Sequence, residues 1–219
     1  MGCASLLSNM TIDSAQYRRR SKNRTADQKK VLDYFVKGGL IPMFTNLKDD
    51  AYEAMVMSKR NSLNIKQMAL GKIGLDESQV NEIPPVTIEG YVFDDNILDH
   101  WEKYGKDGNA RSSAYHVTML FFSDTQVYMY QYIFSMDDDS KRERTEEYFY
   151  RDITNFSTSS ETKDIPELQG CSGKVTNRNY DVKTFSMVVP GDRFSCASKA
   201  NIDSQVNAMK AKLREKKMQ

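Results

Sequence analysis

A pair of prolines, Pro84 and Pro85, divides the chain into two parts with different hydrophobic periods. Proline lacks a backbone N–H and restricts the residue before it, so neither a helix nor a central strand continues through such a pair. Upstream, apolar residues recur at the three- and four-residue spacing of amphipathic helices. Downstream, segments such as VTIEGYVFD and AYHVTMLFFS show the alternation or the short apolar runs of strands. We therefore predict an α+β protein with a helical unit over residues 25–85 and a strand-rich domain over residues 86–219.

The upstream unit carries several helix-boundary signals. Thr25 and Gln28 have the spacing of a capping box at the start of a first helix. Asn46 is placed to cap a second helix, in whose first turn two aspartates would face the positive end of the helix dipole. Gly74 follows the last apolar position of a further helix, and Asp76 is placed to cap one short turn before the proline pair. These signals predict three or four short helices.

Hairpins are expected at two places in the downstream part. AYHVTMLFFS and QVYMYQYIFS read as strands joined by the short connection SDTQ, and Pro190–Gly191 predicts a tight turn between two later strands. Two segments read differently. DDNILDHWEKYG predicts a short helix from Asp95 to Tyr104, and residues 157–179 predict a long polar connection.

Three consecutive aromatic residues stand in the stretch EEYFYRDITNFS. Strict alternation through Arg151 and Asp152 would bury one charge in either register, so we predict a bulge or a strand end at this pair. The aromatic side chains before it are then expected to line mostly the interior of a sheet.

The last segment predicts an amphipathic helix. Ile202, Val206, Met209 and Leu213 follow one another at spacings of four, three and four residues, which places them on one helical face. A small bent sheet exposes apolar side chains at its open end, and a helix of this kind is suited to covering it.

The order of these elements resembles a bacterial pleckstrin-homology-like domain. The YFYRDIT strand, the GDRF hairpin and the closing helix with its basic end carry the resemblance, which covers residues 86–217. It implies a PH-like antiparallel β-barrel or sandwich capped by the C-terminal amphipathic helix, preceded by the helical unit of residues 25–85. It also implies a module that binds protein partners or self-associates, without a catalytic centre and without a cofactor.

Composition excludes several classes of protein. The 31 basic and 30 acidic residues leave a formal charge of +1, whereas a dedicated nucleic-acid binder is usually far more basic. No apolar run reaches the roughly 18 residues of a membrane-spanning helix. Cys3, Cys171 and Cys196 are widely spaced and form no metal or disulfide pattern. We expect a cytoplasmic protein.

Residues 1–24 read as a flexible basic leader. Together with the loop after the second strand of the SDTQ hairpin, this leader suggests an alternative function, contact with an anionic membrane surface or nucleic acid. The candidate anion-contact residues are Arg18, Arg19, Arg20, Lys22, Arg24, Lys141, Arg142 and Arg144.

A second alternative is a metal site or an enzyme. Asp95 and Asp99 would share one face of the expected helix, with His100 beside them, although a capping aspartate on a solvated face explains the same residues. His116 lies in an apolar strand, where a hydrogen-bonded core histidine is the simpler interpretation. The sequence contains no glycine-rich phosphate loop and no nucleophile elbow. We therefore predict a non-enzymatic interaction module.

Overall fold

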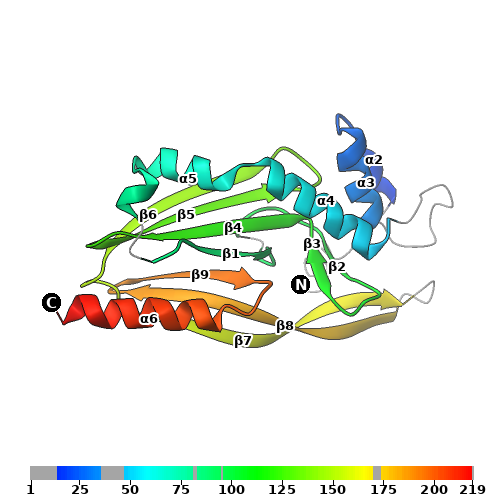
Figure 1. Cartoon of the computed structure of the whole chain (residues 1–219). Helices are drawn as coiled ribbons and strands as arrows, with labels where there is room; N and C mark the ends of the chain where they lie inside the picture. Colours follow the sequence, from blue (N-terminus) through cyan, green and yellow to red (C-terminus); the bar gives the residue numbers. More distant parts are fainter. Residues whose placement is uncertain (1–13, 36–46, 81–82, 95, 170–173, 219) are drawn as a thin grey trace.

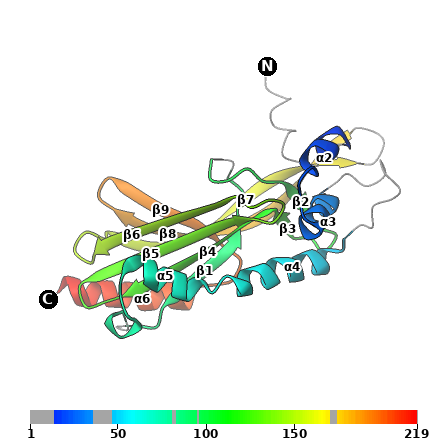
Figure 2. The same ribbon diagram turned by 90° about the horizontal axis from the view of Figure 1, so that it is seen from above.

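The computed structural model describes residues 14–35, 47–80, 83–94, 96–169 and 174–218. Within these residues the chain is α+β, as predicted. Helices cover one face of a four-stranded antiparallel sheet, and a three-stranded antiparallel sheet lies beneath the other face (Figure 1). Seen from above, α4 and α5 run along the four-stranded sheet (Figure 2).

The helical elements belong mainly to the N-terminal part. They are α2 (Ser14–Arg20), α3 (Ala26–Phe35), α4 (Asp49–Ser62), α5 (Ile65–Ile73), the 3-10 turn η1 (Glu77–Gln79) and, at the other end of the chain, α6 (Asp203–Lys217).

The strands form three sheets with the orders β1-β4-β5-β6, β2-β3 and β7-β8-β9. Their bounds are β1 (Val86–Tyr91), β2 (Glu102–Tyr104), β3 (Ala110–Ser112), β4 (Ala114–Phe122), β5 (Gln126–Ser135), β6 (Lys141–Phe149), β7 (Asn155–Gln169), β8 (Lys174–Val189) and β9 (Asp192–Ser198). Among the described residues the sheets stay open, so the arrangement is a sandwich and not a closed barrel.

The predicted helix boundaries of the N-terminal unit are largely confirmed. Thr25 and Gln28 form the capping box: the Gln28 N–H donates to Thr25 Oγ1 at 3.2 Å, and the Thr25 N–H donates to Gln28 Oε1 at 2.9 Å. Gly74 ends α5 with a φ of 70°, a left-handed conformation that glycine adopts without strain. Asp76 caps η1. The expected cap at Asn46 lies outside the described residues.

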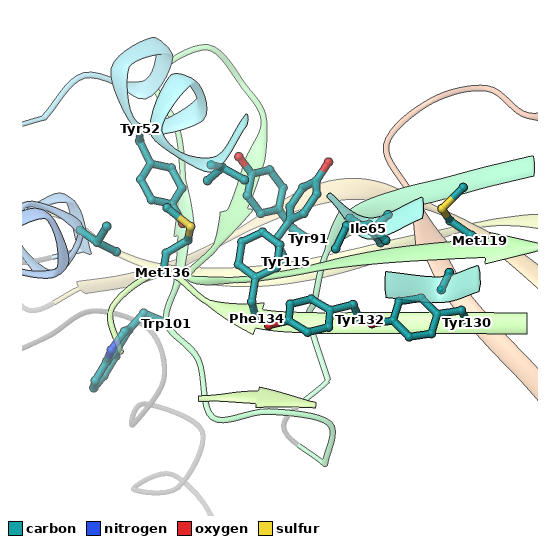
Figure 3. Packing of buried hydrophobic residues seen from close by; sticks show 14 of the residues in the cluster. Tyr52, Ile65, Tyr91, Trp101, Tyr115, Met119, Tyr130, Tyr132, Phe134 and Met136 are labelled. Atoms are coloured by element: carbon teal, nitrogen blue, oxygen red, sulfur yellow. The ribbon is translucent and has the colours of Figure 1, made fainter. Parts of the chain in front are cut away.

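An aromatic core joins the helical unit to the four-stranded sheet. Tyr52 of α4 is fully buried, stacks on Tyr34 at 4.4 Å between ring centroids, and donates its hydroxyl to the Ser112 carbonyl at 2.7 Å. Tyr130, Tyr132 and Phe134 of β5 form a row on the same side of the sheet (Figure 3). Because helices and sheet share this core, the helical unit is part of the folded body and not an attachment to it.

A second core fills the space between the two larger sheets and α6. The predicted stripe of α6 is confirmed, since Val206, Met209 and Leu213 are buried beside Leu120 of one sheet and Phe185 of the other. The hydrophobic effect therefore holds the last helix against the sandwich.

Two sequence expectations about the strand domain are wrong. The expected helix from Asp95 to Tyr104 is absent from residues 96–104, where a loop leads into β2. Trp101, in this loop, is buried, and its carbonyl accepts a bond from the Ser113 N–H at 2.9 Å. The expected polar connection at residues 157–179 is occupied by the long hairpin of β7 and β8. The polar side chains of these residues do not show the hydrophobic alternation typical of strands. Backbone hydrogen bonds between β7 and β8 nevertheless hold them in strands.

The aromatic stretch at the end of β6 is only partly internal. Tyr150 is buried, Tyr148 is half-buried, and Phe149 keeps 44% of its surface exposed. The strand ends at Phe149, and a turn follows in which the Asp152 N–H donates to the Phe149 carbonyl at 2.9 Å. The expected strand end near Arg151 and Asp152 is therefore confirmed.

Candidate functional site

The described part of the surface contains an open cleft of about 720 Å³. Its lining residues come in part from the β2–β3 hairpin and from the long β7–β8 hairpin. Figure 1 shows the β7–β8 hairpin extending past β9 and passing below the β2–β3 hairpin. Residues of β1, β2, β3, β7, β8 and β9 line it, together with one side chain of α4. The lining residues come from segments that are far apart in the sequence, because the meeting of two sheets brings them together.

Aromatic rings form much of the cleft lining. They belong to Tyr91, Phe93, Tyr104 and Tyr180, and the Phe93 and Tyr180 rings lie 5.1 Å apart. Burial, followed by the Glu102 carboxylate, raises the pKa of Tyr180, so its phenol stays protonated at neutral pH. Asn109 and Asn179 add exposed amide groups at the rim. The lining therefore offers flat apolar surfaces beside neutral hydrogen-bonding groups.

A buried arginine supports the floor of the cleft. Arg111 is 2% exposed, and its guanidinium donates to both carboxylate oxygens of Asp107, at 2.8 and 2.6 Å, and to Glu53 Oε2 at 3.2 Å. These bonds from Arg111 hold the pKa of Asp107 well below its usual range. The Arg111 Nε and the Tyr91 hydroxyl are buried polar atoms without a hydrogen-bond partner of good geometry. Arg111 thus fixes the β2–β3 hairpin from beneath and is not an exposed ligand contact.

The charged side chains of the lining are largely paired with one another. Glu53 also accepts a bond from the Lys199 ammonium, so this one carboxylate bridges β3 and the segment after β9. Asp181 and Lys183 are exposed on β8. Because the lining contains both acidic and basic side chains, the cleft does not concentrate one sign of charge as a phosphate site would.

Three of the predicted anion-contact residues are paired with carboxylates of this chain, and Lys141, Arg142 and Arg144 stand in strand β6 and not in a loop as expected. Arg20 pairs with Asp99 at 2.8 Å, and Arg24 pairs with Asp138 at 3.3 Å. Arg144 donates to Glu146 at 2.9 Å. Arg18, Arg19, Lys22, Lys141 and Arg142 are exposed.

The leader and the β5–β6 turn are nevertheless brought together. Residues 14–20 form α2, and Gln28 at the start of α3 donates to Asp139 of the turn at 2.8 Å. The rest of the predicted leader, residues 1–13, lies outside the described residues. The contacts made by Arg20 and Arg24 are therefore with acidic groups of this chain.

The residues of the suggested metal site are not arranged as expected. His100 is buried, with Nδ1 2.8 Å from the Leu98 carbonyl and Nε2 3.0 Å from Glu102. Asp99 points to Arg20, and Asp95 is outside the described residues. In the described part of the chain, no three His, Cys, Asp or Glu side chains gather in a way that could hold a metal ion.

His116 lies at the point where the two larger sheets meet, fully buried as the sequence suggested. Its Nε2 is 2.8 Å from the Ala197 carbonyl, and its Nδ1 is 3.3 Å from the Thr118 hydroxyl. Gln131 donates to Thr118 at 3.1 Å. With the proton on Nε2, His116, Thr118 and Gln131 each have a hydrogen-bond partner in this network. The bond from His116 to the Ala197 carbonyl links β4 to β9.

Comparison with protein-family models, with curated proteins and with solved structures finds no match to the chain. In the described residues, no helix is both long and apolar enough to cross a membrane.

The cleft has no recognisable pattern in the sequence. Glu53, Tyr91, Tyr104, Arg111 and Tyr180 stand in separate segments with no common spacing. The turn-rich KDGNARSS stretch indicates the β2–β3 turn, but it does not indicate which other segments lie beside this turn in the cleft.

Proposed function

We propose that this chain is a non-enzymatic interaction module that binds an extended segment of a partner protein in the cleft. The observation that carries the proposal is the composition of the lining: four aromatic rings and exposed amides lie beside the ion-paired group of Glu53, Arg111 and Lys199. Aromatic rings with a polar tip provide large contact area at low cost in conformational entropy, and they are enriched where proteins bind one another.

The edge of β1 adds a second supporting feature. The Val92 N–H donates to the Ala114 carbonyl, so Val92 and, by alternation, Gly90 direct their backbone groups toward β4. Tyr91 then directs its N–H and C=O toward the cleft side. An extended peptide can bond to such a strand edge, while aromatic surfaces select its side chains.

The proposal includes a pleckstrin-homology-like relationship for residues 86–217. Two packed antiparallel sheets with an amphipathic C-terminal helix over their shared core support it. The β2–β3 hairpin and the long β7–β8 hairpin are departures from a minimal domain of that kind, and both line the cleft.

Site-specific photo-crosslinking tests the proposed function. A photoreactive amino acid at Asn179, on the cleft rim, is used to capture partners from native extract, with the same group at exposed Arg193 as the matched control. We expect a discrete protein adduct at position 179 that is lost when Tyr104→Ala and Tyr180→Ala are combined. An adduct equally strong at position 193, or insensitive to the two substitutions, would contradict the proposal. Native mass spectrometry showing a small molecule bound in place of a protein would also contradict it.

A further inference from the structure

Strand β6 presents an uncovered edge of the four-stranded sheet. It pairs with β5 over the whole range Lys141–Phe149 without a bulge, and it contains no proline. Two other outer strands are each contacted at one point: the Lys199 N–H after β9 donates to the Glu89 carbonyl of β1 at 2.9 Å, and the Thr158 hydroxyl of β7 donates to Asp203 of α6 at 3.0 Å. In the described chain, no backbone hydrogen bond joins the outer edge of β6, from Lys141 to Glu147, to another element.

The hairpin geometry fixes which backbone groups face outward. The Ser135 N–H donates to the Ser140 carbonyl at 2.9 Å, which makes these two residues a hydrogen-bonded pair. Alternation then directs the backbone groups of Arg142, Arg144 and Glu146 toward β5. Those of the odd-numbered residues Lys141, Glu143, Thr145 and Glu147 point away from the sheet, and these four residues are exposed.

The charges of β6 are separated along the strand. Lys141, Arg142 and Arg144 stand in its first half, and Glu146 and Glu147 in its second. Glu143 departs from this division, but its carboxylate is occupied by Lys72 at 3.1 Å and by the Tyr130 hydroxyl at 3.0 Å. An antiparallel copy of the same strand would therefore place positive groups opposite negative ones, and a parallel copy would place like charges together.

We propose that two copies of this chain associate edge to edge through β6, antiparallel, about a two-fold axis at Arg144. In this register Lys141 lies opposite Glu147, and Arg142 lies opposite Glu146, each pair occurring twice. The odd-numbered residues face one another as hydrogen-bonded pairs, as their outward backbone groups require. The two Arg144 residues lie opposite each other at the axis, and each guanidinium keeps Glu146 at 2.9 Å and Asp192 at 3.8 Å within its own chain.

Charged residues on an edge strand usually prevent association, because they leave charges unpaired when two edges meet. The order of charges along β6 instead favours association about a two-fold axis. The basic half of each strand then lies opposite the acidic half of the other. The contact also closes on itself, so it yields a dimer and not a fibre. The surface is separate from the cleft, and this inference does not depend on the proposed function.

Charge exchange in the full-length chain tests the proposal. One variant carries Glu146→Lys and Glu147→Lys, and the other carries Lys141→Glu and Arg142→Glu. Sedimentation velocity should show dimers for the native chain and monomers for each variant alone. An equimolar mixture should restore a dimer, because each reversed half then meets an opposite charge. The native dimer should weaken roughly tenfold or more between low and about 0.5 M salt.

A backbone variant separates edge pairing from other contacts. Thr145→Pro removes an outward N–H without removing a bond to β5, so circular dichroism should be unchanged while the dimer is lost. A native chain that stays monomeric, variants that still dimerise alone, or a mixture that stays monomeric would overturn the proposal. Dimers formed equally by Thr145→Pro would do the same. Crosslinking at Asn179 should be unaffected by Thr145→Pro, which distinguishes failure here from failure of the cleft.

Discussion

At the scale of single residues, the buried polar groups carry the clearest consequences. His116 bonds at both ring nitrogens at the meeting point of the two sheets, and burial lowers its pKa from 6.5 to about 4, against the smaller effect of the bond to Ala197. As the pH falls, His116 therefore takes up a proton at about pH 6.5 in the unfolded chain but only at about pH 4 in the folded chain. The contribution of neutral, buried His116 to the unfolding free energy is therefore complete above about pH 6.5 and is lost as the pH falls toward about 4.

We predict that unfolding free energy decreases by up to about 3 kcal/mol because of this one group as the pH falls from about 7 to about 4. Urea denaturation of the native chain and of His116→Gln over this range measures it. Carboxylates titrate in both proteins, so the difference between the two curves isolates the histidine. Parallel curves would show that His116 does not change its protonation on folding.

Gly105 is required by its side-chain neighbours. A Cβ at this position would lie 2.5 Å from Arg111 Nη1 and 2.6 Å from Asp107 Oδ1, so it would separate the ion pair beneath the cleft. We predict that Gly105→Ala lowers the unfolding free energy by about 1–3 kcal/mol. Gly71 of α5 is the matched control, since a Cβ there meets nothing within 4 Å. Gly71→Ala should be neutral or stabilising by up to about 1 kcal/mol, because alanine favours a helix. Equal effects at the two sites would refute this account.

At the scale of elements, the sequence predicts what is locally determined. The capping box at Thr25, the Gly74 helix end and the stripe of α6 depend on residues within a few positions of one another, and all three are confirmed. The Asp95–Tyr104 helix fails because Trp101 bonds to Ser113 and the segment pairs with β3. Strand β7 gives no signal because its exposed serines and threonines are held by pairing with distant β8. The cleft could not be predicted because its lining also depends on contacts between segments that are distant in the sequence.

The closing helix provides the prediction at this scale. Met209 is fully buried in the core that α6 shares with both sheets. Met209→Ala should lower the unfolding free energy by about 2–5 kcal/mol through loss of buried area and the cavity left behind. Gln205→Ala, on the exposed face of the same helix, should change it by no more than about 0.5 kcal/mol. Chemical denaturation of the two variants measures these changes in unfolding free energy. A negligible change for Met209→Ala would mean that α6 is not packed on the sandwich.

At the scale of the whole molecule, the Pro84–Pro85 boundary divides the sequence pattern but not the folded body. Tyr115, Tyr130 and Phe121 of the sheet are buried in the same core as Tyr52 and Val56 of α4. Side-chain contacts such as the Arg60–Glu89 pair at 2.7 Å and the Lys59 bond to the Ser135 carbonyl at 2.7 Å cross between the two parts.

We predict that residues 86–219 alone expose the aromatic face of the sheet and aggregate or bind a hydrophobic dye strongly. The chain from Thr25 onward keeps that face covered and should stay monodisperse in the same measurement, apart from dimer formation through β6. A fragment of residues 86–219 that is soluble, does not bind the dye and unfolds cooperatively would show that the sandwich folds without its helices.

The close approach of the two sheets at Gly90 has a consequence for the width of the cleft. A methyl group there would lie 3.3 Å from the Ala197 carbonyl oxygen and the Lys199 nitrogen, so the facing strand would have to retreat by a few tenths of an ångström. The same glycine lines the cleft. Because it carries no Cβ, the backbone of Ala197 and Lys199, which also line the cleft, can lie this close to β1. An alanine at position 90 would therefore displace lining backbone without altering any of the four aromatic rings.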